Sequence, residues 1–135
     1  MDITLQDLKI CGALMKEARN NYDRVMHLRE MMERTSRPLR HTPGARSVHK
    51  DYMAEGVAAI DEIERNNSER LAMAMQHVIA VESAITTIPD ATQREIIRMR
   101  YIDAMTWEEI SGKTHYHERW CKELHSRGLR RLGIE

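Results

Sequence analysis

Apolar residues recur at every third or fourth position between residues 4 and 34, which predicts one long amphipathic helix. Pro38 predicts an end to this helix nearby, because proline cannot donate a backbone hydrogen bond and disfavours helical geometry in the residue before it. The predicted apolar stripe consists of Leu5, Leu8, Cys11, Met15, Ala18, Tyr22, Val25, Leu28 and Met32.

A second long helix is predicted from about residue 51 to residue 88, with an apolar repeat of seven that is typical of a coiled-coil seam. Such a helix would be about 54 Å long, so its stripe must be covered by the first helix, by a second copy of the chain, or by both. Asn67 interrupts the repeat, and a buried amide there can fix register and oligomer number, so we expect a homodimer. The two columns are Ile60, Asn67, Ala74, Val81 and Ile88, and beside them Leu71, Val78 and Ile85.

The clearest boundary lies at Pro89, which ends the second helix. Asp90 follows at once and can cap a third helix, with Gln93 placed to reach back to the cap. The chain therefore divides into residues 1–88, a helical hairpin for oligomerisation, and residues 89–135, a separate helical domain.

Two further helices are predicted inside residues 89–135. Thr106 followed three residues later by Glu109 is a capping-box signal for a short helix over residues 107–113. A turn at residues 114–116 leads to the last helix, residues 117–132. Its inward residues are expected to be Cys121, Leu124, Leu129 and Leu132.

The charge distribution bears on function. Lys plus Arg and Asp plus Glu number 21 each, so the net charge is zero and any affinity for DNA must come from local clustering. Basic residues do cluster after residue 112, although pairs four apart, Glu118 with Lys122 and Glu123 with Arg127, could simply solvate a helix face. The basic residues are Lys113, Arg119, Lys122, Arg127, Arg130 and Arg131.

Four short stretches together resemble the fourth region of bacterial sigma factors, a helix-turn-helix. They are residues 88–90 (Ile-Pro-Asp), 98–102 (Arg-Met-Arg-Tyr-Ile), 106–110 (Thr-Trp-Glu-Glu-Ile) and 129–132 (Leu-Arg-Arg-Leu). With its long helical N-terminal part, the chain is similar to phage ArpU and RinA type regulators of late transcription. The resemblance implies a regulator that binds double-stranded DNA and controls a phage or prophage late operon.

The resemblance also implies which residues contact DNA. The base-contacting positions of the family fall on Glu118, Arg119, Lys122 and Glu123, residue types that can pair with guanine or cytosine edges. The chain departs from the family at three positions, Thr114 (usually apolar), His115 (usually glycine) and His117 (usually Ser or Thr as cap). The full set of predicted DNA-binding residues is His117, Glu118, Arg119, Lys122, Glu123, Arg127, Arg130 and Arg131.

Other readings of this segment remain open. The chain could be the small DNA-recognition subunit of a phage terminase, or its sigma-like module could bind RNA polymerase instead of DNA. His117, Cys121 and His125, spaced four apart with His115 nearby, could ligate zinc, but we expect Cys121 to face the core and no metal or other cofactor to bind. Trp107 and Trp120 are expected to be packing residues.

The remaining observations exclude classes of protein. The sequence contains no glycine-rich phosphate-binding loop, no nucleophile motif and no pair of carboxylates within a recognisable catalytic motif, so we do not expect an enzyme. No apolar run reaches membrane-spanning length, and two distant cysteines after an acidic opening suggest a cytoplasmic protein. Residues 34–50 are basic, with no acidic residue, and predict a connector that is either simply solvated or in contact with a phosphate or a partner.

Overall fold

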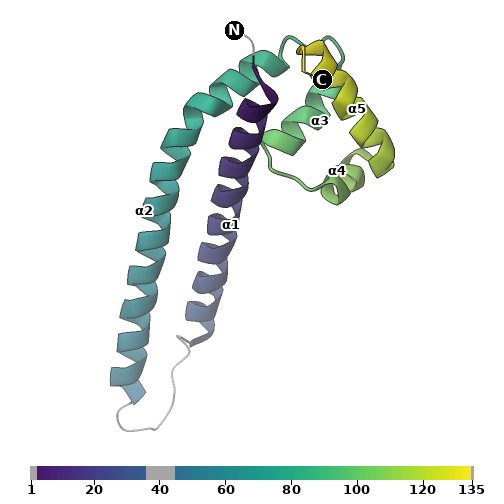
Figure 1. Ribbon diagram of the computed structural model, residues 1–135. Helices are drawn as coiled ribbons and strands as arrows, with labels where there is room; N and C mark the ends of the chain where they lie inside the picture. The colour runs from purple at the N-terminus through teal and green to yellow at the C-terminus, as the bar shows by residue number, and fades with distance from the viewer. Residues whose placement is uncertain (1–2, 36–44, 135) are drawn as a thin grey trace. The chain divides into compact units, whose positions relative to one another are not determined.

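The computed structural model describes residues 3–35 and 45–134, and these residues contain helices and no strands. The predicted all-α class is therefore confirmed for this part of the chain. None of the described helices is long and apolar enough to cross a membrane. The helices are α1 (Leu5–Thr35), α2 (Ala45–Ile85), α3 (Ala91–Tyr101), α4 (Trp107–Thr114) and α5 (Glu118–Arg131) (Figure 1).

The main departure from the predicted helix boundaries is the start of α2. This helix begins at Ala45 and not near Asp51, so the last part of the segment predicted as a basic connector is helical. The reason lies in the sequence, because no proline or glycine follows Gly44 until Gly56. The rest of that connector, residues 36–44, lies outside the described residues.

The C-terminal end of α2 is marked by two threonines that hydrogen-bond to the backbone. The hydroxyl of Thr86 donates to the carbonyl of Ser83 (2.7 Å), and that of Thr87 donates to the carbonyl of Ala84 (2.6 Å). Side chains that satisfy the last carbonyls in this way replace the next backbone hydrogen bonds of a helix. The helix therefore ends at Ile85, slightly before the predicted end at Ile88.

The described residues form two compact units. The first contains the chain up to residue 17 together with residues from 70 onward, and the second contains residues 18–69. The first unit thus includes residues on both sides of Pro89. The functional division at that residue, into an oligomerisation part and a DNA-binding part, remains a prediction.

In the second unit, parts of α1 and α2 pack against each other. Arg29 forms an ion pair with Glu64. At Gly56 the helices approach closely, since a Cβ atom there would lie 2.9 Å from the sulfur of Met32. Ala18, Val25 and Ile60 are buried among the described residues of this unit.

The predicted heptad column of α2 does face the interior. Ile60, Ala74, Val81 and Ile88 are all buried, and Asn67 is partly buried with its Oδ1 atom sealed from solvent and without a hydrogen-bond partner. The predicted stripe of α1 is also inward, with one exception. Tyr22 is 62% exposed, and its neighbour Asn21 is partly buried instead.

The first unit has two hydrophobic clusters that meet on α3. The first cluster includes Ile97 and Tyr101 of α3, and the second includes Ile96 and Met99, so opposite sides of this short helix are buried. The first cluster is completed by Leu8, Cys11, Val81, Ile85, Ile88, Leu129 and Ile134, and the second by Ile110, Cys121 and Leu124.

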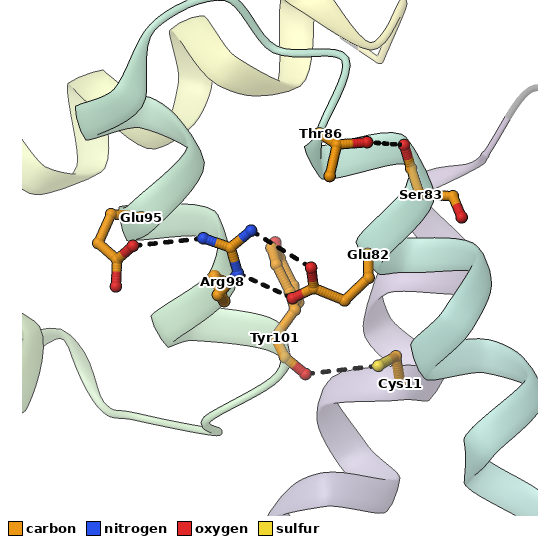
Figure 2. Close-up of polar contacts among 7 residues, drawn as sticks. All are labelled: Cys11, Glu82, Ser83, Thr86, Glu95, Arg98 and Tyr101. Carbon is orange, nitrogen blue, oxygen red and sulfur yellow. Dashed lines mark hydrogen bonds and ion pairs between the residues drawn. The ribbon is translucent and has the colours of Figure 1, made fainter.

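Polar contacts also join α3 to α1 and α2 within the first unit (Figure 2). Arg98 donates from Nε and Nη2 to the two carboxylate oxygens of Glu82, at 2.8 and 3.2 Å, and from Nη1 to Glu95 at 3.3 Å. The hydrogen bonds to Glu82 are the largest cause of the raised pKa of Arg98. The thiol of Cys11 donates to the carbonyl of Tyr101 at 3.5 Å. These contacts fix the position of α3, on which α4 and α5 pack.

Candidate nucleic-acid interface

The start of α3 and the start of α4 are set by the caps that the sequence predicts. Asp90 accepts a hydrogen bond from the backbone N–H of Gln93 at 2.9 Å. Thr106 and Glu109 form a complete capping box, with distances of 3.1 and 3.2 Å. One detail is wrong, because the side chain of Gln93 does not reach back to the cap and its Oε1 atom is buried without a partner.

The turn between α4 and α5 explains why glycine is expected at position 115. His115 adopts a left-handed conformation, with φ 64° and ψ 15°, and its N–H donates to the carbonyl of Ser111 at 2.9 Å. Glycine adopts this conformation without steric cost, and most other residues do not. The hydroxyl of Ser111 donates to the carbonyl of Tyr116 at 2.6 Å and closes the turn. The turn therefore forms with histidine at this strained position.

The other two departures from the sigma-like pattern are also accommodated. Thr114 is partly buried, and its hydroxyl donates to the carbonyl of Ile110 at 2.8 Å, so a polar residue at this apolar position is satisfied. His117 caps α5 through Nδ1, which accepts from the backbone N–H of Arg119 at 3.2 Å. A histidine nitrogen thus replaces the hydroxyl of the usual Ser or Thr cap.

Helix α5 has a buried side and an exposed side. Successive residues of an α-helix are rotated by about 100°. Cys121, Leu124 and Leu129 are buried, as predicted, and Gly128 is buried with them. Directly opposite lie Arg119, Glu123 and Arg130, and Trp120, Arg127 and Arg131 form a second row beside them. The exposed members of the predicted DNA-binding set are His117, Glu118, Arg119, Lys122, Arg127, Arg130 and Arg131, and Glu123 is partly exposed.

Gly128 permits close contact between α5 and α3. A Cβ atom at this position would overlap Cδ1 of Ile97, which is fully buried, and would also touch Gln93 at 3.5 Å. Only glycine leaves room for the Ile97 side chain between the two helices. The buried side of α5 therefore packs closely against α3, and this packing fixes the position of the exposed side.

The charged residues of α5 differ in whether they are already paired. Glu123 binds Arg127 at 3.1 Å, which is one of the two pairs predicted from the four-residue spacing. The other predicted pair, Glu118 with Lys122, is not formed among the described residues. Within the same part of the chain, the guanidinium groups of Arg119, Arg130 and Arg131 have no ion-pair partner and are open to solvent.

Trp120 is exposed, although it is expected from the sequence to be a packing residue. It is 41% exposed, and the guanidinium of Arg127 lies over its ring, 5.0 Å from the ring centroid. A shallow hollow of about 430 Å³ beside it is lined by His117, Arg119, Trp120 and Glu123. The signal was present, because Trp120 lies seven residues before Arg127 and so shares its exposed row.

Trp107 does pack, at the edge of the second cluster, and it carries two cations on its ring. Arg100 lies 4.7 Å and Lys122 6.0 Å from the ring centroid, while His125 meets the ring edge-on at 5.1 Å. Arg100 also donates to the carbonyl of Met105 at 3.0 Å. Lys122 of α5 therefore makes a cation–π contact with α4 through this ring. No pattern in the sequence indicated the role of Arg100.

The three residues that could have formed a zinc site have other roles. His117 is the cap of α5, Cys121 is fully buried beside the hydroxyl of Thr114 (3.6 Å), and Nε2 of His125 lies 2.7 Å from the hydroxyl of Tyr101. Among the described residues, no group of three His, Cys, Asp or Glu side chains is arranged to hold a metal ion. The predicted absence of a cofactor remains a prediction.

The buried position of His125 has a consequence for acid stability. Burial, with a smaller contribution from Arg100, lowers the pKa of His125 from its ordinary value of 6.5 to about 4. Because the unfolded chain takes up this proton first, stability is lost as the pH falls from 6.5 towards 4. We expect a loss of about 1–2 kcal/mol, less than the full shift implies because the ring is partly exposed.

This loss can be measured by urea unfolding, followed by circular dichroism, across that pH range. His125→Gln keeps a group that can bond to Tyr101 and removes the titration, so its stability should depend less on pH. Equal pH dependence in the two proteins would contradict the assignment.

The chain matches no family model, no curated protein and no solved structure. Its function must therefore be inferred from the surface that α3, α4 and α5 form.

Proposed function

We propose that α3, α4 and α5 form a helix-turn-helix that binds double-stranded DNA through α5, and that the protein is a sequence-specific transcription regulator. The observation that carries the proposal is that three arginines without an ion-pair partner in the described part of the chain, Arg119, Arg130 and Arg131, lie on the exposed side of a helix whose opposite side is buried. Arg119 lies in the first turn of this helix, and Arg130 and Arg131 lie in the last. A helix of this kind fits the major groove while the preceding helix braces it.

The unpaired state of these arginines favours binding to DNA. A guanidinium that is already paired must give up its partner before it contacts phosphate or base, whereas Arg119, Arg130 and Arg131 are free within the described residues. Arginine is suited to both tasks, because its planar fork matches the guanine edge and the phosphate group. Arg127 is different, since Glu123 and Trp120 already hold it.

The position of each residue along α5 suggests which residues contact bases and which contact phosphates. Residues near the start of a recognition helix meet base edges, so Arg119, with Glu118, is placed to read sequence, whereas Lys122 would first have to leave the ring of Trp107. Glu123 is constrained by its pair with Arg127 and would read a cytosine only through its second carboxylate oxygen. Arg130 and Arg131 are placed to hold phosphates, which fixes orientation and adds affinity for any sequence.

The resemblance to sigma region 4 and to ArpU and RinA type regulators makes a phage or prophage late operon, in the cytoplasm of a bacterial host, the target we favour. Two alternatives use the same surface: a phage terminase small subunit that recognises a packaging site, and a module that binds RNA polymerase. The number of chains in the assembly distinguishes a terminase subunit from a regulator, because a packaging ring contains many subunits and a regulator is expected to be a dimer.

We also propose a homodimer, formed by a surface other than the heptad column. That column is already buried in a single chain, so a second copy must use other residues. Exposed apolar side chains lie on both long helices. They are Tyr22, Met26 and Met31 of α1, and Tyr52, Val57, Met73, Met75 and Ile79 of α2.

The experiment that tests DNA binding begins with selection of bound duplexes from a random pool. On the selected site, Arg119→Ala should cost about 1–3 kcal/mol and relax the preference at one base pair. Arg130→Ala should weaken selected and random duplexes alike and reduce the log–log salt slope by about 0.9. Both effects are measured by fluorescence anisotropy over a range of salt concentrations.

The matched control is Arg65→Ala, which removes an exposed arginine of α2 outside the proposed interface. It should bind as the parent does, and circular dichroism should show all three variants folded. If the folded Arg119 and Arg130 variants also bind as the parent does, α5 does not read DNA and the protein-binding alternative takes its place.

A further inference from the structure

Trp120 is a large apolar side chain exposed in the first turn of α5, between His117 and Lys122. It is 41% exposed because it lies in the exposed row of α5 with Arg127, whereas Cys121 and Leu124 face the core. Tryptophan side chains at protein surfaces often act as anchors for a partner. The neighbouring charges limit what that partner can be.

The Trp120 ring is held in place before any partner arrives. Arg127 covers it at 5.0 Å, and Glu123 in turn holds Arg127 at 3.1 Å. A side chain ordered in this way loses less conformational entropy on binding. A ring stacked on its own helix is also poorly placed to slide between base pairs, so we expect edge contact and not intercalation.

The hollow beside the ring is bounded by both apolar and hydrogen-bonding groups. Its lining consists of His117, Arg119, Trp120 and Glu123. The unpaired guanidinium of Arg119 at one side favours a partner that is negatively charged or rich in acceptors, which duplex DNA is. In the major groove only one group on the base edges is apolar, namely the 5-methyl group of thymine.

We infer that Trp120 is a specificity-determining residue that contacts the 5-methyl group of a thymine, next to the base that Arg119 reads. This inference rests on the proposed DNA binding and extends it by naming the base. It also gives Arg127 and Glu123 a positioning role, since Arg127 covers the ring and Glu123 holds Arg127.

The test uses the selected duplex with each thymine replaced in turn by uracil, a change that removes only the methyl group. The parent protein should lose about threefold to tenfold in affinity at one thymine and little at the others. At the same position, 5-methylcytosine paired with guanine should bind better than cytosine paired with guanine. Trp120→Ala should bind the thymine and uracil duplexes equally.

Arg119→Ala is the matched control, because it should weaken binding yet keep the preference for thymine over uracil. Trp120→Leu provides a second variant, and it should retain part of that preference. The uracil scan on the parent needs no variant at all, so a folding defect in Trp120→Ala would not prevent the test.

The outcomes separate this inference from the proposed function. If the parent binds no duplex selectively, the proposed function fails. If Arg119 reads a base but no single thymine is sensitive to uracil, or the selected site has no thymine, DNA binding stands and the role of Trp120 is overturned. The role is equally overturned if Trp120→Ala binds every duplex as the parent does, which would leave the ring available to a protein partner.

Discussion

Replacing Ile97 by alanine is expected to lower the free energy of unfolding of the first unit by about 2–5 kcal/mol. Ile97 is fully buried in the first cluster, and it lies against Gly128. The cost depends on how far the surroundings can collapse into the space left behind. Gly128 has no side chain to move into that space, so we expect a value in the upper part of the range. Urea unfolding monitored by circular dichroism measures it.

Ile79→Ala is the matched control, because it makes the same chemical change in the same unit at a side chain that is 60% exposed. It should change stability by no more than about 0.5 kcal/mol. If both variants lost the same amount, the packing of α3 against α5 described here would be incorrect.

Replacing Asn67 by leucine is expected to raise the free energy of unfolding by about 2–3 kcal/mol. The Oδ1 atom of Asn67 is buried without a hydrogen-bond partner, so the substitution removes a desolvation cost and adds apolar surface to the column that holds the buried Ile60. Thermal and urea unfolding would show the change.

Asn66→Leu provides a precise comparison, since the same substitution falls on the adjacent, exposed asparagine. It should leave stability nearly unchanged. Light scattering at tens of micromolar should show a dimer for the parent and for both variants, because the Oδ1 atom of Asn67 is already sealed from solvent within a single chain. A monomer would contradict the proposed homodimer, and a changed oligomer in Asn67→Leu alone would place this residue at the interface between chains.

Much of the secondary structure could be predicted, because the signals that set it are local. The caps at Asp90 and Thr106, the column of Ile60 to Ile88 and the inward residues of α5 are read from neighbours in sequence, and the structure has them where the patterns indicate. The start of α2 differs from the prediction because residues 45–50, which are basic and follow Pro43 and Gly44, resemble a connector in composition. Charge does not break a helix, whereas proline and glycine do.

The parts that could not be predicted depend on residues distant in sequence. That Arg100 lies over Trp107, that Ile97 requires Gly128 and that His125 meets Tyr101 are tertiary facts with no local signal. Trp120 is an intermediate case. The seven-residue spacing to Arg127 indicates that Trp120 lies in an exposed row, but tryptophan is usually buried, and this general tendency favours the opposite prediction.

The first hydrophobic cluster also constrains the order in which the chain can fold during synthesis. Leu8 and Cys11 belong to the same cluster as Leu129 and Ile134, so the cluster is complete only after residue 134 has left the ribosome. Contacts of such large sequence separation slow folding, because a long loop must close before they form. Val81, Ile85 and Ile88 are synthesised earlier and can cover Leu8 and Cys11 first. The nascent protein therefore passes through a stage in which this cluster is only partly covered, and Leu129 and Ile134 complete its burial.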